Sequence, residues 1–494
     1  MKIGFICDLH LPYGEQSVQY AFFNKALSVI RKEKPDTVIC VGDIAAFGEI
    51  SAIKYYFDKV SSLNHNFVLG NSDVRDVNTV DEVLSLPSGF SFDVGDRKIL
   101  GVDTPFAKFD ENAMSSICSL KDGDVLIIHH SVRGLLKESR DFLNEQLEQK
   151  ALTVIHAHTH AANDYNCGRS RIIEIRALDP DKSIGNFPCV TFFEITDSDI
   201  TYYEKLLAVE NSSILSLRDY FGLSCLNNAE DLRFAIEHNV KRVELRCGNN
   251  EIGLDEETCR LAVEWKRKTG GYLSIHMPNL CYYADGLKGE NNWKNAIALA
   301  NLLNADALTM HPPRVSVELI KSDSVKNELL QLYAYAVNSV APSVKIGIEN
   351  LHLKKGENEM NRDFGYTPDE VSFWIDEINK ILSNEGRVGH VLDVGHARNN
   401  GVFAQRFPIG KWYACMGGKT IGYHIHQVVR ANNEFSNHKP IEDWFGPMIS
   451  YASFFYCWKH NVLNHVPIFL EVKGYENFKK SIDAFMSLFD LSEN

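Results

Sequence analysis

The sequence has no run of about eighteen consecutive apolar residues, the length that a membrane-spanning helix requires. None of its eleven cysteines forms a CxxC pair, and an odd number cannot all pair within one chain. Residues 1–8 lead directly into an expected strand and lack the apolar stretch and cleavage site of a signal peptide. We therefore expect a cytoplasmic protein with reduced thiols and no membrane segment.

A basic excess is also absent, because the net charge is −14. An acidic protein exerts no long-range attraction on nucleic acid. Carboxylates that bind metal add to this count, and the metals offset them locally. The charge therefore disfavours a nucleic-acid substrate without excluding one.

The length of 494 residues exceeds what one hydrophobic core usually serves, so we expect two domains. Residues 1–205 alternate short β-prone runs with helical patterns and end in strands without helices between them, which predicts an α/β sandwich. Residues 206–221 are interpreted as a linker. From 222 to 494, eight strand-then-helix units predict a (β/α)8 TIM barrel. Its expected strands are 223–226, 242–246, 272–276, 307–311, 345–349, 390–393, 420–424 and 467–472.

Five short polar motifs stand at or just after expected strand ends in the N-terminal part. They are Asp8-Leu9-His10, Gly42-Asp43, Gly70-Asn71-Ser72-Asp73, His129-His130 and Ala157-His158-Thr159-His160. Aspartate, histidine and asparagine are ligands that Mn²⁺, Fe or Zn²⁺ accept. A carboxylate such as Asp43 can bridge two cations, which then clamp a phosphate and supply a hydroxide for in-line attack. Any one of these motifs alone is readily explained by chance, but the ordered set of five predicts a two-metal phosphoesterase.

This ordered set resembles the calcineurin-like metallophosphoesterase superfamily, whose pattern is D-x-H, GD, GNH[DE], H and GH-x-H. The resemblance covers residues 1–205 and implies two divalent metals, Mn, Fe or Zn. One metal would be held by Asp8, His10 and His160, and the other by Asn71, His129 and His158, with Asp43 bridging. Catalytic roles are then expected for Asp43, Asn71 and His129, and His130 is interpreted as a non-ligand.

Two positions depart from the pattern of this superfamily. Ala157 replaces the usual glycine, a change that a small residue tolerates. Ser72 replaces a histidine that many members use to protonate the leaving group or steady the phosphate. Small members without that histidine often favour phosphodiesters, and the loss of a general acid raises the demand for a good leaving group. We therefore favour a diester substrate.

In the C-terminal part, six consecutive expected strands each end in a residue type that binds metal, at the end of the barrel where active sites lie. These residues are His276, His311, Glu349, Asp393 with His396, His424 and Glu471, and His438 follows in the loop after the seventh strand. Unpaired carboxylates crowded at one barrel mouth would repel each other unless cations neutralised them. The pattern predicts a multi-metal centre. We interpret His352, His390 and His426 as structural.

The set resembles the xylose isomerase-like TIM barrels and, within them, the AP endonuclease branch. Isomerases and epimerases of that superfamily need a Glu, Asp, His, Glu set, which Glu349, Asp393, His424 and Glu471 supply. The endonuclease branch adds four histidines, matched here by His276, His311, His396 and His438. Ser436 stands where that branch has an aspartate, so the resemblance implies two or three divalent metals, Zn or Mn. Glu349 and Glu471 are the expected catalytic residues.

These motifs support three alternative hypotheses about function. The leading one is a bifunctional phosphoester hydrolase, whose second substrate is a phosphodiester of a nucleic acid or nucleotide. The second joins the phosphoesterase to a sugar or sugar-phosphate isomerase or epimerase, with Glu349 and Glu471 transferring protons. The third makes one domain a non-catalytic scaffold that binds a partner, a role that Ser72 and Ser436 favour. The sequence leaves the substrate, the metals and the oligomeric state open.

Overall fold

The computed structural model describes residues 1–248, 254–382, 386–431 and 434–490. The chain divides into two compact units. The first comprises Met1–Ala208 with Phe445–Ser453, and the second comprises Val209–Trp444 with Phe454–Asn494. The sequence places Phe445–Ser453 within the expected barrel, yet this segment joins the first unit, where the backbone N–H of Ser450 donates to the carbonyl of Asp181 at 3.0 Å.

The expected linker at 206–221 is partly helical. It holds α6 (Asn211–Leu215) and the 3-10 helix η2 (Ser216–Tyr220), both in the second unit. The boundary between the two units therefore falls near the start of the segment that the sequence marked as a connection. None of the described helices is long and apolar enough to cross a membrane.

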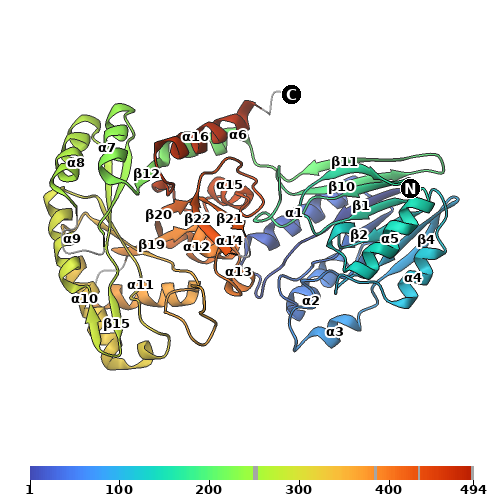
Figure 1. Ribbon diagram of the computed structural model, residues 1–494, viewed down its shortest axis with the longest axis horizontal. Coiled ribbons are helices and arrows are strands. Elements are labelled where there is room, and N and C mark those ends of the chain that lie inside the picture. The colour runs from blue at the N-terminus through green and yellow to red at the C-terminus, as the bar shows by residue number, and fades with distance from the viewer. Residues whose placement is uncertain (249–253, 383–385, 432–433, 491–494) are drawn as a thin grey trace. The chain divides into compact units, whose positions relative to one another are not determined.

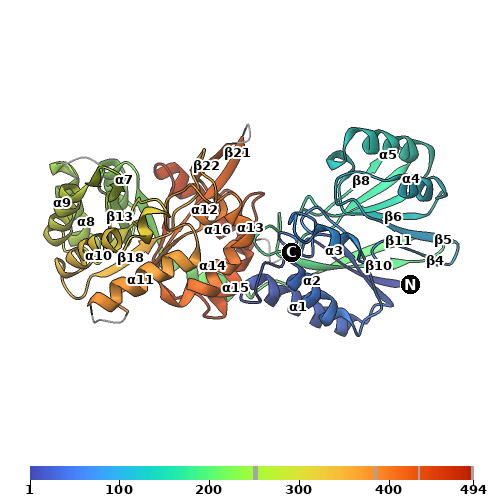
Figure 2. The same ribbon diagram turned by 90° about the horizontal axis from the view of Figure 1, so that it is seen from below.

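The first unit is a sandwich of two sheets, which confirms the predicted α/β sandwich. One sheet has the order β11 (Ile200–Leu206), β10 (Cys189–Ile195), β1 (Lys2–Ile6), β2 (Thr37–Val41) and β3 (His65–Val68). The other has the order β4 (Phe90–Val94), β5 (Arg97–Val102), β6 (Val125–Ile128), β7 (Thr153–His156), β9 (Ser170–Glu174) and β8 (Asn163–Cys167). Figure 2 shows α4 (Glu111–Cys118) and α5 (Lys137–Gln149) on one outer side of the sheets and α1 (Val18–Glu33) and α2 (Ile50–Val60) on the other. The short helices α3 (Val80–Leu84) and η1 (Val132–Gly134) lie in loops.

Strand alternation builds two apolar layers in this unit. Because successive strand residues point to opposite faces, β6 contributes Ile127 to the core between the sheets and Leu126 with Ile128 to the layer that contains residues of α4 and α5. All three side chains are fully buried. The near-continuous apolar composition of the parallel strands follows from burial on both faces.

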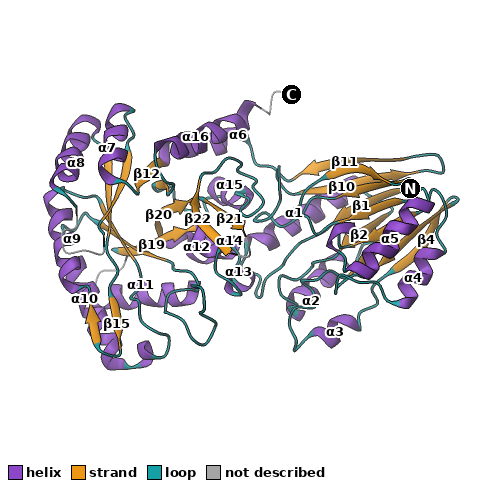
Figure 3. Ribbon diagram, in the orientation of Figure 1, coloured by secondary structure: helices purple, strands orange, loops and turns teal. Residues whose placement is uncertain are grey.

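The second unit is a closed barrel of eight parallel strands, as predicted (Figures 1 and 3). In order they are β12 (Phe221–Cys225), β13 (Arg242–Arg246), β14 (Tyr272–His276), β17 (Ala307–Met310), β18 (Lys345–Glu349), β19 (Val388–Asp393), β20 (Thr420–Ile425) and β23 (Ile468–Leu470). The longer helices between and after them are α7 (Asn228–Glu237), α8 (Glu256–Thr269), α9 (Glu290–Leu302), α10 (Asp323–Asn338), α11 (Pro368–Leu382), α14 (Ile409–Met416), α15 (Ala452–Lys459) and α16 (Tyr475–Asp490).

Shorter elements fill the loops of the barrel. Two antiparallel hairpins, β15 (Cys281–Tyr283) with β16 (Gly286–Lys288) and β21 (Gln427–Ala431) with β22 (Glu434–Lys439), follow the third and seventh barrel strands. The helical turns are η3 (Leu319–Lys321), α12 (Val394–Arg398), α13 (Phe403–Arg406) and η4 (Gly417–Lys419). Since all barrel strands run the same way, their C-terminal ends gather at one mouth.

The core between the two sheets should dominate the stability of the first unit. Ile127→Ala should lower its free energy of unfolding by about 2–5 kcal/mol, because the change removes apolar contact and leaves a cavity between the sheets. Urea denaturation measures this loss. Val77→Ala, at a side chain that is 84% exposed, is the matched control and should change stability by less than about 0.5 kcal/mol. Equal effects of the two changes would contradict the assigned core.

Candidate metal centres

Strained loop conformations mark the predicted ligands. Eleven non-glycine residues in the described chain have positive φ. Six of them are predicted ligands, namely Asp8, His10, Asp43, His158, His160 and His438. This left-handed conformation is costly for residues with a side chain, and it persists where the surrounding structure imposes it, typically at functional sites.

In the first unit, Asp43 lies between two groups of side chains. Its Oδ1 is 3.4 Å from Nε2 of His129, and its Oδ2 is 3.8 Å from Nε2 of His10. Ligand atoms within 4.8 Å of one another form two groups, one of Asp8, His10 and His160 and the other of Asp43, His129 and His158. The side-chain amide of Asn71 lies 3.3 Å from Nε2 of His129. The structure thus gathers six predicted side chains around the carboxylate of the seventh, Asp43.

Neighbouring groups fix the orientation of the Asp43 carboxylate. The backbone N–H of Ser72 donates to Oδ1 at 2.7 Å, and the Ser72 hydroxyl donates to Oδ2 at 2.9 Å. The Asp73 carboxylate accepts from the backbone N–H of Asp43 at 3.0 Å. Gly42 has a φ of +80°, and a Cβ added there would lie 2.7 Å from Nδ1 of His129, so only glycine fits. Ser72, at the position of the missing histidine, therefore orients the carboxylate that faces both groups.

Burial keeps most imidazoles of this cluster neutral. It lowers the pKa of His158 to about 4, and it lowers the pKa values of His10 and His160 well below the ordinary value. Burial acts in the same direction on His129, but the adjacent Asp43 carboxylate outweighs it, and the pKa of His129 rises to about 9. A neutral imidazole offers the lone pair that a metal ligand requires, and a cation that binds His129 would displace a proton.

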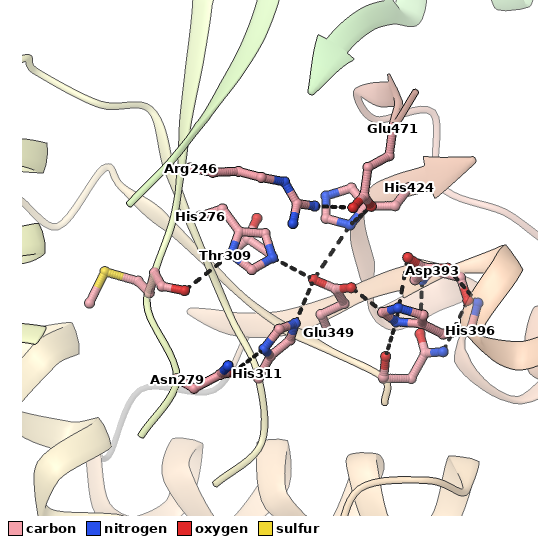
Figure 4. Close-up of polar contacts among 12 residues, drawn as sticks. Arg246, His276, Asn279, Thr309, His311, Glu349, Asp393, His396, His424 and Glu471 are labelled. Atoms are coloured by element: carbon pink, nitrogen blue, oxygen red, sulfur yellow. Dashed lines mark hydrogen bonds and ion pairs between the residues drawn. The ribbon is translucent and has the colours of Figure 1, made fainter. Parts of the chain in front are cut away.

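In the barrel, Glu349 is the centre of a polar cluster at the C-terminal ends of the strands (Figure 4). Its Oε2 lies 2.9 Å from Nε2 of His276, 3.4 Å from Nε2 of His311 and 3.4 Å from Nδ1 of His424. Its Oε1 lies 3.2 Å from Nδ1 of His396. Four imidazoles, at or after the third, fourth, sixth and seventh barrel strands, therefore converge on one buried carboxylate at the end of the fifth strand.

Glu471 and Asp393 complete the predicted set in the barrel. Nδ1 of His424 is 3.2 Å from Oε2 of Glu471, and Nδ1 of His438 is 3.0 Å from Oε1. Oδ2 of Asp393 is 3.4 Å from Nδ1 of His396. One compact group, with ligand atoms within 4.8 Å of one another, contains Glu349, Asp393, His424 and Glu471. All of the barrel residues that the sequence predicted therefore lie at one site.

Glu244, a fully buried carboxylate on β13, was not predicted from the sequence. Its Oε1 is 2.8 Å from Nε2 of His424. It also accepts hydrogen bonds from the hydroxyls of Ser274 at 3.0 Å and Thr309 at 2.7 Å. Burial acts to raise the pKa of Glu244, but the neighbouring His424 outweighs it, and the pKa falls to about 2. The ionised Glu244 therefore holds Nε2 of His424 and leaves Nδ1 facing Glu349.

Two further residues of this site were also missed. Arg246 ends β13 and forms an ion pair with Glu471 (Figure 4). His426, which the sequence suggested to be structural, has its Nε2 3.3 Å from Oδ1 of Asp393 and belongs to a group with His438 and Glu471 that could hold a metal. The sequence signal for Glu244 and Arg246 is the charge at alternate positions of the strand Arg242-Val243-Glu244-Leu245-Arg246, to which no role was assigned from the sequence.

Both donor sets fit divalent cations. The barrel site buries four carboxylates, Glu244, Glu349, Asp393 and Glu471, each at most 1% exposed. The guanidinium of Arg246 supplies one permanent positive charge close to them. In the first unit, Oδ1 of Asp8 is buried and accepts no hydrogen bond from any residue in the described ranges. Buried anions require compensating positive charge, and a cation among the imidazoles would supply it.

Family models match both units. Residues 232–488, more than half of the chain, match the xylose isomerase-like TIM barrel. The chain belongs to the xylose isomerase-like TIM barrel family. Residues 1–178 match the calcineurin-like phosphoesterase superfamily domain, so this TIM barrel protein carries a second family domain at its N-terminal end. Both predicted resemblances are confirmed, and both families are generally metal-dependent.

Solved structures of low sequence identity match parts of the chain. A D-tagatose 3-epimerase-like protein is 18% identical, covers 56% of this chain and 100% of its own, and has a TM-score of 0.40. Endonuclease IV from Thermus thermophilus is 14% identical, with coverage of 55% and 99% and a TM-score of 0.38. Vps29 from Entamoeba histolytica, complexed with Zn²⁺, is 18% identical, with coverage of 42% and 93% and a TM-score of 0.27. No curated protein matches the chain.

Glu244→Gln should weaken divalent-metal binding in the barrel by about 10–100-fold, because the amide no longer fixes the His424 ring. Dialysis against chelators of increasing affinity, followed by counting the metal ions that remain bound, measures this change. The ions of the first unit serve as an internal reference. Asp376→Asn, which removes an exposed partner of Lys419, is the matched control and should change nothing. Metal retention equal to that of the wild type would refute a positioning role for Glu244.

Proposed function

We propose that the first unit hydrolyses phosphodiesters with two divalent cations, Mn, Fe or Zn. The observation that carries this proposal is that the two oxygens of Asp43 face the two histidine groups, at 3.4 Å and 3.8 Å. Asp8, His10 and His160 would hold one cation, Asn71, His129 and His158 the other, and Asp43 both. Cations held there supply Lewis acidity and a nucleophile for attack on phosphorus at neutral pH.

The residues around this site favour a diester with a good leaving group. The Ser72 hydroxyl donates its proton to Oδ2 of Asp43, so it is not available to an incoming ester oxygen. Burial, together with the positive charge of His129, lowers the pKa of His130 to about 3, so His130 is uncharged at neutral pH and is not a general acid. Without a general acid at either position, the leaving group has to depart as a stable anion.

For the barrel, we infer cleavage of a second phosphodiester, in a nucleic acid or nucleotide, with two or three divalent cations, Zn or Mn. Support comes from His276 and His311, which flank Oε2 of Glu349 at 2.9 Å and 3.4 Å. These two histidines lie outside the four-residue set that an isomerase needs. His438 lies in a group with His426 and Glu471 that would hold a third cation, and Ser436 supplies no further carboxylate there.

A sugar isomerase or epimerase is the second candidate for the barrel. The compact group of Glu349, Asp393, His424 and Glu471 supports it, because this group is complete without the additional histidines. In such an enzyme, the cations would polarise a sugar carbonyl and hydroxyl, and Glu349 and Glu471 would transfer protons.

Asp43→Asn should lower hydrolysis of bis(p-nitrophenyl) phosphate by about a hundredfold or more, because a neutral amide cannot hold two cations. Release of p-nitrophenolate measures the rate. Asp376→Asn, the same chemical change at an exposed partner of Lys419, is the control and should leave this rate unchanged. Full activity in Asp43→Asn would remove the first unit as the catalyst and would favour a role in binding a partner.

The barrel is tested in the full chain with Asp43→Asn, which silences the first unit. This variant should cleave DNA that contains an abasic site, and Glu349→Gln added to it should abolish cleavage, because Glu349 faces four imidazoles of the site. Gel electrophoresis of labelled strands measures cleavage. Isomerisation of a ketose from a matched panel, without cleavage of DNA, would instead establish the second candidate.

A further inference from the structure

A pocket of about 430 Å³ lies in the first unit beside the candidate metal centre. It is lined by Ser131, Arg133, Thr159, Asn163, Tyr165 and Glu174. Ser131 follows His130 in the loop after β6, and Thr159 lies between the predicted ligands His158 and His160 after β7. One lining residue of the pocket, Thr159, is therefore the direct sequence neighbour of two proposed ligands.

The strand register places three of the lining side chains on one face. In the antiparallel pair β8–β9, Asn163 is directly opposite Glu174, and Tyr165 follows Asn163 by two residues. Residues opposite each other, and residues two apart, share a face of a sheet. Tyr165, Asn163 and Glu174 thus form one wall, and the loops after β6 and β7 provide Arg133, Ser131 and Thr159. The sheet order β6-β7-β9-β8 makes these four elements neighbours.

This wall combines an aromatic ring with an ionised acceptor. The ring of Tyr165 is partly buried against the apolar layer that contains Ile172. Oε1 of Glu174 lies 3.3 Å from Nε2 of His156, and this contact, which outweighs the effect of burial, lowers the pKa of Glu174. Oε2 of Glu174 lies 3.5 Å from the hydroxyl of Thr159. The carboxylate is therefore ionised at neutral pH and accepts hydrogen bonds on the pocket side.

Arg133 adds a positive charge at the rim. It is exposed, and it forms no ion pair with any carboxylate in the described part of the chain. The charge of Arg133 nevertheless interacts with two side chains of the pocket wall, because it acts to lower the pKa values of both Tyr165 and Glu174. A single unpaired guanidinium suits one phosphate group. A long polyanion would need a basic surface, and the net charge of the protein is −14.

We propose that this pocket binds the nucleoside of a mononucleotide diester whose base carries an exocyclic amine, so that the first unit is a nucleotide-ester hydrolase. This inference rests on the proposed diesterase activity. The base stacks on Tyr165, its amino group donates to the Glu174 carboxylate, and Arg133 pairs with phosphate charge. Asn163, Ser131 and Thr159 offer polar groups to the sugar and to the other edge of the base.

Three esters with the same leaving group test this proposal on the full-length protein. They are the p-nitrophenyl phosphate esters of methanol, of the cytidine 5′-hydroxyl and of the uridine 5′-hydroxyl. The wild type should prefer the cytidine ester to the methyl ester by about tenfold or more in kcat/KM, through stacking and the amine contact together. It should also prefer cytidine to uridine, because uracil has no exocyclic amine to donate to Glu174.

Variants at two pocket residues test whether the preference for nucleoside esters arises in this pocket. Tyr165→Leu should lower kcat/KM for both nucleoside esters about tenfold and leave the methyl ester unchanged, whereas Tyr165→Phe keeps the ring and should behave as the wild type. Glu174→Gln should lower the ratio of kcat/KM for the cytidine ester to kcat/KM for the uridine ester about tenfold. If the wild type hydrolyses all three esters equally, or if Tyr165→Leu lowers all three rates alike, the pocket proposal is wrong and the diesterase proposal stands.

A binding measurement separates the two proposals. Calorimetric titration of Asp43→Asn with cytidine 5′-monophosphate should give saturable binding that Tyr165→Leu, added to this variant, weakens about tenfold. In one outcome, the wild type hydrolyses none of the three esters while Asp43→Asn still binds cytidine 5′-monophosphate through Tyr165. That result would overturn the hydrolase proposal and support the nucleotide pocket. Absence of binding, together with equal hydrolysis of the three esters, would overturn the pocket alone.

Discussion

A buried carboxylate has to be matched by positive charge, and both units of this protein are arranged around that requirement. Asp43 in the first unit and Glu349 in the barrel are each at most 1% exposed and face histidines on more than one side. An uncompensated buried charge costs several kcal/mol. Without a cation, protons fill part of this role: burial acts to lower the pKa values of His129 and His396, yet the adjacent carboxylates raise both to about 9.

Both the sandwich and the barrel place the predicted carboxylates and histidines at or beyond the C-terminal ends of parallel strands. Parallel strands bring their C-terminal ends to one edge in the sandwich and to one mouth in the barrel, so residues distant in sequence converge. In the sandwich, loops with positive φ at Asp8, Asp43 and His158 aim the side chains. In the barrel, strand ends carry His276, Glu349 and His424, whereas α12 carries His396 and the hairpin strand β22 carries His438. Each centre also has a supporting polar residue, Ser72 on Asp43 and Glu244 on His424, which fixes the residue facing the centre.

The sequence predicted the two folds and the residues that gather at each centre, because each motif is short and follows an apolar strand whose end is visible in the pattern. It did not predict Glu244 or Arg246, since charges in a barrel strand look like ordinary alternation until closure turns one face inward. His426 was interpreted as structural, and its contact with Asp393 is visible only in the structure. Membership of Phe445–Ser453 in the first unit was also invisible, since it depends on contacts with residues such as Asp181, more than two hundred positions earlier.

Anomalous diffraction from crystals of the chain grown with Mn²⁺ locates each bound cation relative to the buried carboxylates. One peak is expected on each side of the Asp43 carboxylate, and at least two peaks are expected around Glu349. Crystals that show bound Mn²⁺ elsewhere, but no peak beside Asp43 or Glu349, would contradict the proposed metal centres.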